Sequence, residues 1–548
     1  MSPPAQEGEE TPLPPVGTRP PLPVDRNRPD RVEEERTLGA LGAGPVTWLE
    51  GEGLWALSVD PERWPAICRC ISEVMHHPLS TLFGEEAHGG IRLHALFLGH
   101  DPTPGVHVRC PLHPGVLSAP SLAATIPFVA PFEREVAEMF GVTFLGAMDR
   151  RPLLLHERHS APPLRKGPPA TPTGELEPYV FPPVEGEGVY EIPVGPVHAG
   201  VIEPGHFRFQ AVGEEILDLE VRLGYTHKGT ERLFEGQPVA RGTLWAESIS
   251  GDMSVAGGVA YAHAAERALD SRVPAVTEAA RGLLLELERI AFLCGDVAGI
   301  SLDVGYAVGA ARANRLRERT YAGLRSLTGS RLGRAIVGVG GFRRPLVLGD
   351  PAELILTLRE TSARIQALRD HLLDKSSVVD RLQGTGIIHR WTAELLHFLG
   401  PTARASGLRI DLRVDRPYGP YRDVEVHVPR GLQGDVQDRL TVKVDEVVEA
   451  CRLSETFLGR LGQGIPPAPA TPPPPGEPRE GLGWVESPRG EFLVYLALAP
   501  DGTLGRVHVR DPSFLTWPAI EQAVRGNIVP DFPLCNKSLN LSYSGYDR

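Results

Sequence analysis

The fold of this chain is decided by residues 195–236, GPVHAGVIEPGHFRFQAVGEEILDLEVRLGYTHKGTERLFEG. The stretch opens with a loop that holds His198, Glu203 and His206 and is too rich in glycine and proline to be a helix. Residues 207–212 alternate apolar and polar side chains, and a second alternating run, ILDLEVRL, follows after a turn. The pattern predicts a hairpin that supports a polar loop at one end. An ordinary surface hairpin has the same pattern, so both interpretations stay open at this point.

Bulk composition limits the classes of function. The chain has 548 residues, with 56 basic and 69 acidic side chains, a formal charge of −13 and a hydrophobic content of 41%. This length allows two or more domains, and the acidic balance argues against nucleic acid or an anionic membrane as the main partner. No apolar run approaches the roughly 20 residues of a membrane helix, and the start MSPPAQEGEE lacks a signal core. We therefore expect a cytoplasmic protein that meets the membrane only through partner subunits.

Signatures for bound cofactors are absent from the sequence. The six cysteines form no CxxC pair, and two of them are too close together for common zinc or cluster sites. They are Cys68, Cys70, Cys110, Cys294, Cys451 and Cys535. The glycine-rich turn GVGGFRRPL is not GxGxxG, and there is no P-loop. We expect reduced thiols, and no cofactor bound by this chain itself.

Changes in pattern divide the chain into segments and predict an α+β fold. Residues 1–36 are rich in proline and charge and predict a disordered arm. Residues 37–157 alternate strand and helix patterns, which predicts a small α/β domain, and residues 158–193 predict a Pro/Gly-rich linker. Residues 194–548 contain long helical periodicities, which predicts a large helical bundle with peripheral β-hairpins and a polyproline insert at 466–478.

Two long motifs of the larger domain resemble a known family. GPVHAGVIEPGHFRF and GYTHKGTERLFEG resemble the start of the large subunit of membrane-bound energy-converting nickel–iron hydrogenases and of the related D-type (49-kDa-like) subunit of complex I. RPYGPYRDVEVHVPRGLQGDVQDRLTVKVDEVVEACRL resembles a later part of the D-type subunit. The resemblance implies a subunit of a membrane-associated oxidoreductase.

The smaller domain resembles the C-type (30-kDa-like) subunit of complex I. The motif is FEREVAEMFGVTF followed by PLLLHE, and its matching positions are Glu133, Arg134, Glu135, Glu138, Met139 and Phe140. In that family the segment is structural, so we interpret Glu133 and Glu135 as solvated or interfacial. The order of C-type and D-type domains resembles the fused large subunit of formate hydrogenlyase-type complexes.

The hydrogenase resemblance implies a nickel–iron centre held by two CxxC pairs, but the cysteines are missing. Their positions are occupied by Ser250 and Met253 in the first pair and by Ser542 and Gly545 in the second. None of these residues supplies the thiolate that soft metals require. The printed sequence ends three residues beyond Gly545, so we expect no tail for metal-coupled maturation to remove. We expect no nickel–iron site and no hydrogenase activity.

The resemblance also assigns roles to charged residues around the expected cavity. Glu203 matches the hydrogenase glutamate that passes protons near the metal, and Arg489 in ESPRGE matches the arginine that projects over it. Asp303 in SLDVGY matches the complex I aspartate that partners a quinone-loop histidine. Each has an ordinary alternative: Glu203 as an exposed loop acid, Arg489 as a turn residue, and Asp303 as a helix cap.

Histidines supply the other candidates for this cavity. His198 corresponds to the first histidine of the complex I GPxH loop, whereas His206 falls two residues away from the second. His227 in GYTHKG is a further candidate for the acceptor cavity. Gly251 stands where complex I has its quinone-binding tyrosine, which weakens the case for a quinone.

These observations lead to a functional expectation with one alternative. Electrons would pass from the iron–sulfur cluster of a small B-type partner subunit to a quinone-like or other small acceptor. Glu203, His198 or His206 would supply protons, and Arg489 would stabilise negative charge. The hetero-oligomer would include antiporter-like and H-type membrane subunits, lie on the inner face of the membrane and couple the reaction to ion transport. The alternative is a non-catalytic coupling subunit whose cavity is no longer used.

Overall fold

The structure, a computed structural model, describes residue 39 and residues 46–49, 54–87, 89–99, 105–167, 170–198, 202–461, 465 and 479–548. The predicted arm 1–36 and the polyproline insert 466–478 lie outside these residues. The described part mixes helices and strands, which confirms the predicted α+β class. None of its helices is long and apolar enough to cross a bilayer.

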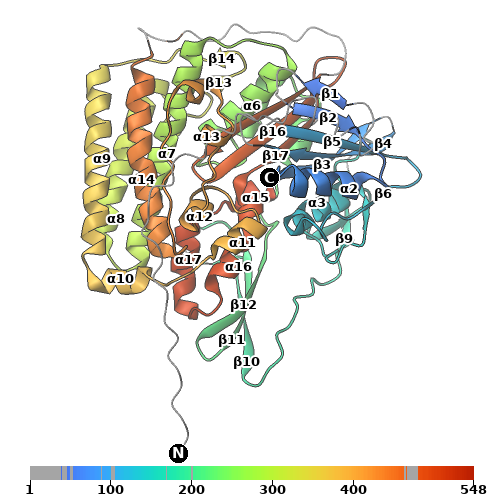
Figure 1. Cartoon of the computed structure of the whole chain (residues 1–548), viewed down its shortest axis with the longest axis horizontal. Helices are drawn as coiled ribbons and strands as arrows, with labels where there is room; N and C mark the ends of the chain where they lie inside the picture. Colours follow the sequence, from blue (N-terminus) through green and yellow to red (C-terminus); the bar gives the residue numbers. More distant parts are fainter. Residues whose placement is uncertain are drawn as a thin grey trace, which may run out of the picture.

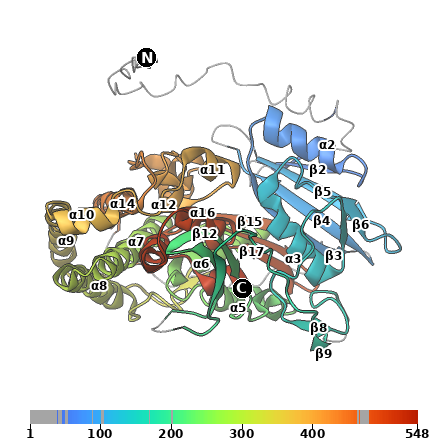
Figure 2. The same ribbon diagram turned by 90° about the horizontal axis from the view of Figure 1, so that it is seen from below.

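A five-stranded sheet forms the N-terminal unit (Figures 1 and 2). In spatial order its strands are β1 (Val46–Leu49), β2 (Leu54–Ser58), β5 (Gly105–Leu112), β4 (Gly90–Phe97) and β3 (Leu79–Ala87). Only the β2–β5 pair is parallel. The two strands predicted around the turn DPTPG are β4 and β5, and their antiparallel pairing is confirmed. Short elements complete the unit: α2 (Trp64–Arg69), a π-turn (Cys70–Val74), β6 (Ser118–Pro120), a 3₁₀ turn (Pro127–Val129), α3 (Ala130–Phe140) and β7 (Thr143–Leu145).

The segment expected to be a linker, 158–193, contains regular structure. Strand β8 (Glu157–His159) pairs with β9 (Pro172–Glu175), and β10 (Val189–Val194) joins the predicted hairpin as a third strand. The Tyr179 hydroxyl donates to Glu220 over 2.8 Å. The segment is therefore not a free spacer, because its polar groups are bonded to the hairpin and its final strand is part of that sheet.

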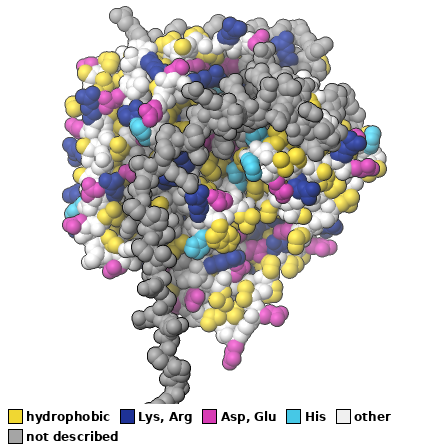
Figure 3. Space-filling model, in the orientation of Figure 1, with side chains coloured by type: hydrophobic (Ala, Val, Ile, Leu, Met, Phe, Trp, Pro, Cys, Tyr) yellow, Lys and Arg dark blue, Asp and Glu magenta, His cyan; other side chains and the backbone are white. Residues whose placement is uncertain are grey.

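The hairpin predicted from residues 195–236 is confirmed. Strands β11 (His206–Val212) and β12 (Glu215–Arg222) are antiparallel, with Phe207 opposite Val221 and Phe209 opposite Leu219. The sheet β10–β11–β12 projects from the body of the molecule at the bottom of Figure 1. Hydrophobic side chains gather over this projection in Figure 3, whereas basic and acidic ones are interspersed over the bundle.

Four long helices, α7, α8, α9 and α14, form the bundle on the left of Figure 1. Their bounds are α7 (Ala275–Asp303), α8 (Ala307–Thr328), α9 (Pro351–Leu373) and α14 (Val436–Leu458). The shorter elements around them are α4 (Thr230–Phe234), α5 (Val239–Ala246), α6 (Ser254–Ala268), β13 (Val337–Gly338), β14 (Gly341–Phe342), α10 (Ser376–Leu382), α11 (Arg390–Leu395), α12 (Gly400–Ala405), α13 (Leu412–Asp415) and a 3₁₀ turn (Gly419–Asp423). The apolar stripes of the long helices share one core, as the helical periodicity predicted.

A second sheet joins the bundle to the N-terminal unit. It consists of β15 (Glu480–Ser487), β16 (Gly490–Leu498) and β17 (Leu504–Arg510), and β15 lies directly on α6. Two glycines permit this approach, because a Cβ at Gly481 would be 2.0 Å from the carbonyl oxygen of Ala264 and one at Gly483 would be 1.9 Å from that of Ala260. The chain then ends in α15 (Pro512–Thr516), α16 (Pro518–Val524), a 3₁₀ turn (Val529–Asp531), α17 (Phe532–Leu539) and α18 (Tyr543–Asp547).

The N-terminal unit and the C-terminal helices share a hydrophobic core. Phe132 of α3 packs on Phe514 with ring centroids 4.8 Å apart. Glu135, on the same helix, forms an ion pair with Arg548 at 2.6 Å, while Glu133 accepts hydrogen bonds from Ser121 and the backbone of residue 122. Both glutamates are buried, so the expectation that they are solvated is wrong. Glu135 is interfacial, but the interface lies within this chain.

Candidate functional site

Segments that are distant in the sequence meet around a cleft of about 680 Å³ at the lower end of the bundle. We call it the α7 cleft, because one face of α7 forms its floor. The lining residues are Ile202, Glu203, Gly251, Asp252, Ala291, Phe292, Gly295, Asp296, Ala298, Gly299, Leu302, Ala310, Asn314, Arg317, Tyr321, Arg489, Asn536, Lys537, Asn540, Leu541, Ser542, Tyr543 and Ser544. Helix α17, which supplies several of them, lies at the lower end of α7 beside the base of the projecting sheet (Figure 1).

The positions that resemble metal ligands come together at the wall of the α7 cleft. Ser250 and Ser542 are 292 residues apart in the sequence, yet their hydroxyl oxygens are 2.7 Å apart. The backbone N–H of Gly545 donates to the Ser542 hydroxyl over 2.9 Å, so Ser542 caps α18. Met253 is buried at the residue just before α6. Ser250 and Ser542 thus bring two hydroxyl groups together, whereas Met253 carries a thioether and Gly545 has no side chain.

Asp511 is a member of this cluster that sequence reasoning missed. The Ser250 hydroxyl donates to its carboxylate over 2.9 Å, and the carboxylate is fully buried. A Cβ at Gly545 would be 2.4 Å from Asp511 Oδ2, so the carboxylate occupies the space that a side chain at Gly545 would need. The other carboxylate oxygen of Asp511 accepts from the backbone N–H of Ser513 over 2.8 Å and so caps α15.

This donor set does not fit a nickel–iron centre. The groups around the site are the hydroxyls of Ser250 and Ser542 and the carboxylate of Asp511, all of them hard oxygen donors that are already hydrogen-bonded to one another. Nickel and iron in such a centre require thiolate sulfur. Among the cysteines, all of which are in the described part of the chain, none lines the α7 cleft.

Arg489 reaches the α7 cleft from the turn between β15 and β16, but its charge is paired. Its Nη1 and Nη2 donate to the two carboxylate oxygens of Asp252, each over 2.8 Å, and its Nε donates to the carbonyl of Asn540 over 2.6 Å. The Arg489 side chain is 5% exposed, whereas that of Asp252 is 45% exposed. Burial favours the protonated acid, but the charge and hydrogen bonds of Arg489 lower the pKa of Asp252 below its ordinary value. The pair is therefore a neutral unit, and Asp252 is a second residue that sequence reasoning missed.

Glu203 lines the α7 cleft from the loop that precedes β11. One of its carboxylate oxygens accepts a hydrogen bond of 3.1 Å from the backbone N–H of Ser544. Lys228 lies within electrostatic range of Glu203, and desolvation lowers the pKa of this lysine while Glu203 opposes that shift. The neighbouring Tyr543 has a pKa raised to about 12, chiefly by burial. Glu203 is therefore the titratable group of the hairpin loop that faces the α7 cleft.

The histidine candidates lie behind or away from the α7 cleft. The His198 ring is 6.5 Å from that of Tyr543, and burial lowers its pKa. His206 Nδ1 donates to the carbonyl of Gly195 over 3.3 Å, and burial lowers its pKa as well. His227 donates to the carbonyl of Asp547 and lines a separate cavity of about 260 Å³ near the N-terminal unit. The structure therefore does not gather the three histidines at the site of Glu203 and Arg489.

Asp303 is the last residue of α7 and is not among the residues that line the α7 cleft. Burial raises its pKa, and the charge of Lys537 opposes the shift. The alternative of an N-terminal helix cap is wrong, because Asp303 stands at the C-terminal end of its helix. Its position favours an influence on Lys537 over direct contact with a bound molecule.

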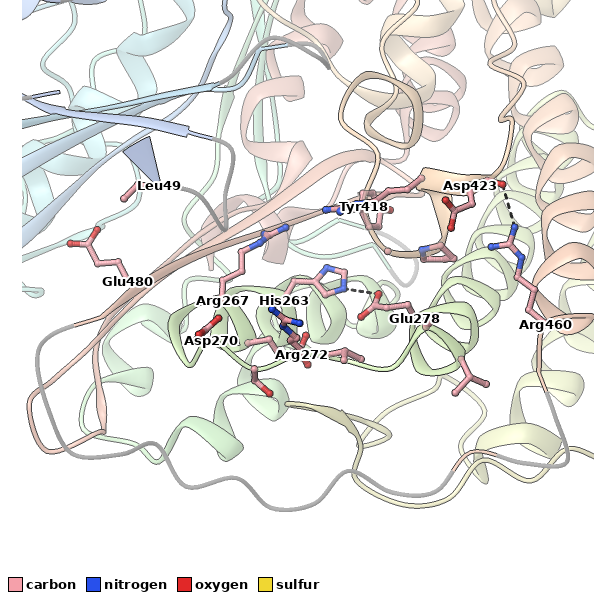
Figure 4. A pocket seen from close by; sticks show the side chains of 18 of the residues that line it. Leu49, His263, Arg267, Asp270, Arg272, Glu278, Tyr418, Asp423, Arg460 and Glu480 are labelled. Carbon is pink, nitrogen blue, oxygen red and sulfur yellow. Dashed lines mark hydrogen bonds and ion pairs between the residues drawn. The ribbon is translucent and has the colours of Figure 1, made fainter. Parts of the chain in front are cut away.

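A cavity larger than the α7 cleft lies elsewhere, near the start of α7, and has a volume of about 1190 Å³ (Figure 4). Its acidic and histidine side chains His263, Glu266 and Glu278 offer ligand atoms within 4.8 Å of one another. Arg281, however, donates to Glu266 over 2.6 Å and 2.9 Å and to Glu278 over 2.9 Å. A cation is therefore already present in this cluster, which argues against a metal site there.

Family models match both parts of the chain. The model of the Respiratory-chain NADH dehydrogenase, 30 Kd subunit, matches residues 57–173. The model of the Respiratory-chain NADH dehydrogenase, 49 Kd subunit, matches residues 303–476 and 471–548. The order of the two matches is the one that the resemblance implied.

Relatives and a solved structure agree with these matches. Hydrogenase-4 component G of Escherichia coli (strain K12) is 31% identical over 444 residues, which are 78% of this chain and 76% of the relative. Formate hydrogenlyase subunit 5 of the same strain is 32% identical over 441 residues, with 78% and 77% covered. The fused C/D subunit of the NADH-quinone oxidoreductase of Rhodopseudomonas palustris (strain BisB18) is 27% identical over 557 residues, with 90% and 95% covered.

A chain in the structure of the membrane-bound sulfane sulfur reductase, an archaeal respiratory membrane complex, shares the fold with a TM-score of 0.61. It is 24% identical, and the match covers 66% of this chain and 99% of that one. The chain described here therefore belongs to the family of respiratory-complex subunits in which 30-kDa-type and 49-kDa-type NADH dehydrogenase domains are fused, a family that includes Hydrogenase-4 component G and Formate hydrogenlyase subunit 5.

Proposed function

We propose that this chain is the acceptor-reducing subunit of a membrane-associated oxidoreductase that works without a nickel–iron centre. Electrons would arrive from the iron–sulfur cluster of a small B-type partner and reduce a quinone-like or other small molecule in the α7 cleft. The chain would lie on the inner face of the membrane, and antiporter-like and H-type membrane subunits would couple this step to ion transport. The relatives named above, which are subunits of oxidoreductases and hydrogenases, support the assignment to such a complex.

One observation carries the proposal: a cleft persists where the metal-ligand positions converge. Ser542 and Arg489 both line it, and Glu203 reaches it from the opening hairpin. A protein that had lost both metal and function at this position would be free to fill the space with apolar side chains. The lining instead keeps a titratable acid and several hydrogen-bonding groups around a space large enough for a small molecule.

The residues of the chain have distinct tasks in this proposal. Glu203 holds or transfers a proton at its carboxylate, since it faces the α7 cleft and is held by the Ser544 backbone N–H. The Arg489–Asp252 ion pair forms part of the wall of the α7 cleft and presents a dipole there, not a net charge. The serine hydroxyls and Asp511 close the position of the former metal. The histidines expected to protonate the acceptor do not line the α7 cleft and have no task in this proposal.

The decisive experiment replaces Glu203 in the intact membrane complex. Glu203→Gln keeps the shape and removes the titratable group, so acceptor reduction should slow on the order of 10² or more. Glu214→Gln, in the exposed turn of the same hairpin, is the matched control and should leave the rate unchanged. Assembly is checked by the set of polypeptides present in the purified complex. Unchanged turnover of a fully assembled Glu203→Gln complex would favour the alternative, in which the chain only couples its neighbours and the cleft is unused.

A further inference from the structure

We propose that the α7 cleft takes a small anionic electron acceptor, held by Lys537 and Arg317. The inference rests on the proposed function and specifies the class of molecule that is reduced. It follows from the distribution of paired and unpaired charges around the α7 cleft.

The acids of the α7 cleft each have a cation at hand. Asp252 is paired with Arg489 through two hydrogen bonds of 2.8 Å. Asp296 contacts the Lys443 ammonium, and its other oxygen accepts from Asn540 Nδ2 over 2.5 Å. Glu203 lies in the field of Lys228, as described above. The negative charges of the lining are therefore compensated before any ligand enters.

Two lining cations are left without an acid of the α7 cleft as partner. Arg317 forms an ion pair of 3.3 Å with the neighbouring surface residue Glu318, which Arg331 also binds over 2.6 Å. Lys537 forms no ion pair within the described residues, and Asp303, whose raised pKa the charge of Lys537 opposes, lies outside the lining. Arg317 and Lys537 are therefore the two lining cations that form no ion pair with an acid of the α7 cleft.

The floor of the α7 cleft is shaped to receive these two side chains. Gly295 and Gly299 are one turn apart on α7, so they lie on the same helical face. A Cβ at Gly295 would be 3.2 Å from Arg317 Cδ, and one at Gly299 would be 2.7 Å from Lys537 Cδ. The stems of a residue from α8 and a residue from α17 thus lie across bare helix backbone. This packing places both side chains at the α7 cleft, one from α8 and one from α17.

The neighbouring groups suit an anion better than a lipid-like quinone. Two asparagine side chains also line the α7 cleft: Asn314 lies one turn before Arg317 on α8, and Asn536 directly precedes Lys537 in the sequence. Cations and amide N–H groups are donors that match anionic oxygens, and ligands with charged groups gain strong charge-assisted hydrogen bonds there. A long apolar tail would instead require a continuous apolar groove, while this lining alternates Phe292 and Leu302 with charged and amide residues.

The test uses two naphthoquinone probes that differ in charge. Naphthoquinone sulfonate is anionic, and menadione, a methyl naphthoquinone, is neutral. Two reduced methyl viologen cations each give one electron, and two protons from water complete the conversion of either probe to its hydroquinone; the rate without complex is subtracted, and no bond to the protein is made or broken. The measured quantity is the ratio of kcat/KM for the sulfonate to kcat/KM for menadione in the assembled complex. This ratio cancels effects on electron delivery and on proton transfer.

Removal of one cation should lower this ratio selectively. Lys537→Met should reduce it about tenfold, because one charge-assisted contact is lost. Lys537→Arg should restore most of it, and Arg317→Met should lower it independently of Lys537. Arg312→Met is the control: it removes an exposed charge from α8, the helix of Arg317, at a position outside the α7 cleft, and it should leave the ratio unchanged.

Each remaining outcome has a definite meaning. A ratio that stays the same in both Lys537→Met and Arg317→Met overturns the anionic-acceptor inference while the proposed function stands. A ratio that falls as much in Arg312→Met shows a general surface-charge effect and also overturns it. If the assembled wild-type complex reduces neither probe, the inference is overturned, while the proposed function is judged separately by the Glu203→Gln experiment.

Discussion

The Arg489–Asp252 pair permits a prediction whose sign depends on the structure. Arg489 is the more deeply buried partner, at 5% exposure against 45% for Asp252. Removing the carboxylate therefore leaves a buried guanidinium whose remaining strong acceptor is the carbonyl of Asn540. Removing the guanidinium instead leaves an acid that regains contact with water. We expect Asp252→Asn to destabilise the chain more than Arg489→Met.

The magnitudes follow from the exposure of the two groups. Breaking a fully buried ion pair costs about 3–5 kcal/mol, and an asparagine amide still accepts one of the two hydrogen bonds, so about 3 kcal/mol is expected for Asp252→Asn. For Arg489→Met we expect about 1–2 kcal/mol, because solvent screening limits the loss at Asp252 and packing over the Phe292 ring, 4.5 Å from the guanidinium carbon, is partly kept. The double variant should recover about 2 kcal/mol relative to the sum of the single variants.

The assay is equilibrium unfolding of the isolated chain in denaturant, with the free energy taken from midpoint shifts at a common slope. The effect of Arg489 outweighs that of burial, so the pKa of Asp252 lies below its ordinary value. The coupling energy between Arg489 and Asp252 should therefore be constant above about pH 4 and decline only as the pH falls below that value. Single-variant effects that add within about 0.5 kcal/mol would refute the coupling. A larger loss for Arg489→Met than for Asp252→Asn would refute the assignment of the buried partner.

Three further predictions follow from other parts of the molecule. Purified complex should contain no stoichiometric nickel, and one nickel per chain in elemental analysis would contradict this expectation. Cysteines introduced at all four ligand positions should bind cadmium tightly only if Asp511→Ala also makes room beside Gly545. Burial lowers the pKa of His508 to about 4, so its neutral form contributes up to roughly 3 kcal/mol to the stability above about pH 6.5, and this contribution is lost as the pH falls towards 4. The urea midpoint of the His508→Gln variant should therefore vary less between pH 6.5 and 4 than that of the wild type, and an equal variation would count against this assignment. A fragment of residues 1–180 should lack fixed tertiary packing in near-ultraviolet circular dichroism, because its core lacks Phe514 and Glu135 loses its cation; a native spectrum with cooperative unfolding would show that the fragment folds alone.

The sequence was sufficient for features that depend on local pattern or on residue identity. Alternation of side chains predicted β11 and β12, and helical periodicity predicted the bundle. The absence of cysteine at the four ligand positions was equally plain, since the chemistry of a thiolate belongs to one residue type. The resemblance of motifs also anticipated that Glu203 and Arg489 lie near each other, as both line the α7 cleft.

Partnership between distant residues was decided only by the tertiary structure. Local pattern does not show that Asp252 neutralises Arg489 or that Asp511 fills the space beside Gly545, because those contacts join segments that are far apart along the chain. The same limit applies to 158–193, where composition predicted a linker although β10 finds its partner in the hairpin.

The charge that a molecule meets in the α7 cleft is also a property of the folded chain. Arg489 appears in the sequence as a free cation, whereas Lys537 has no pattern that distinguishes it from a surface lysine. In the folded chain the buried Arg489 is paired with Asp252. The Lys537 stem instead lies over the bare backbone at Gly299 and reaches the α7 cleft without an acidic partner there. Residue types and their order thus determined which groups are available, and only packing decided which of them remain free to act.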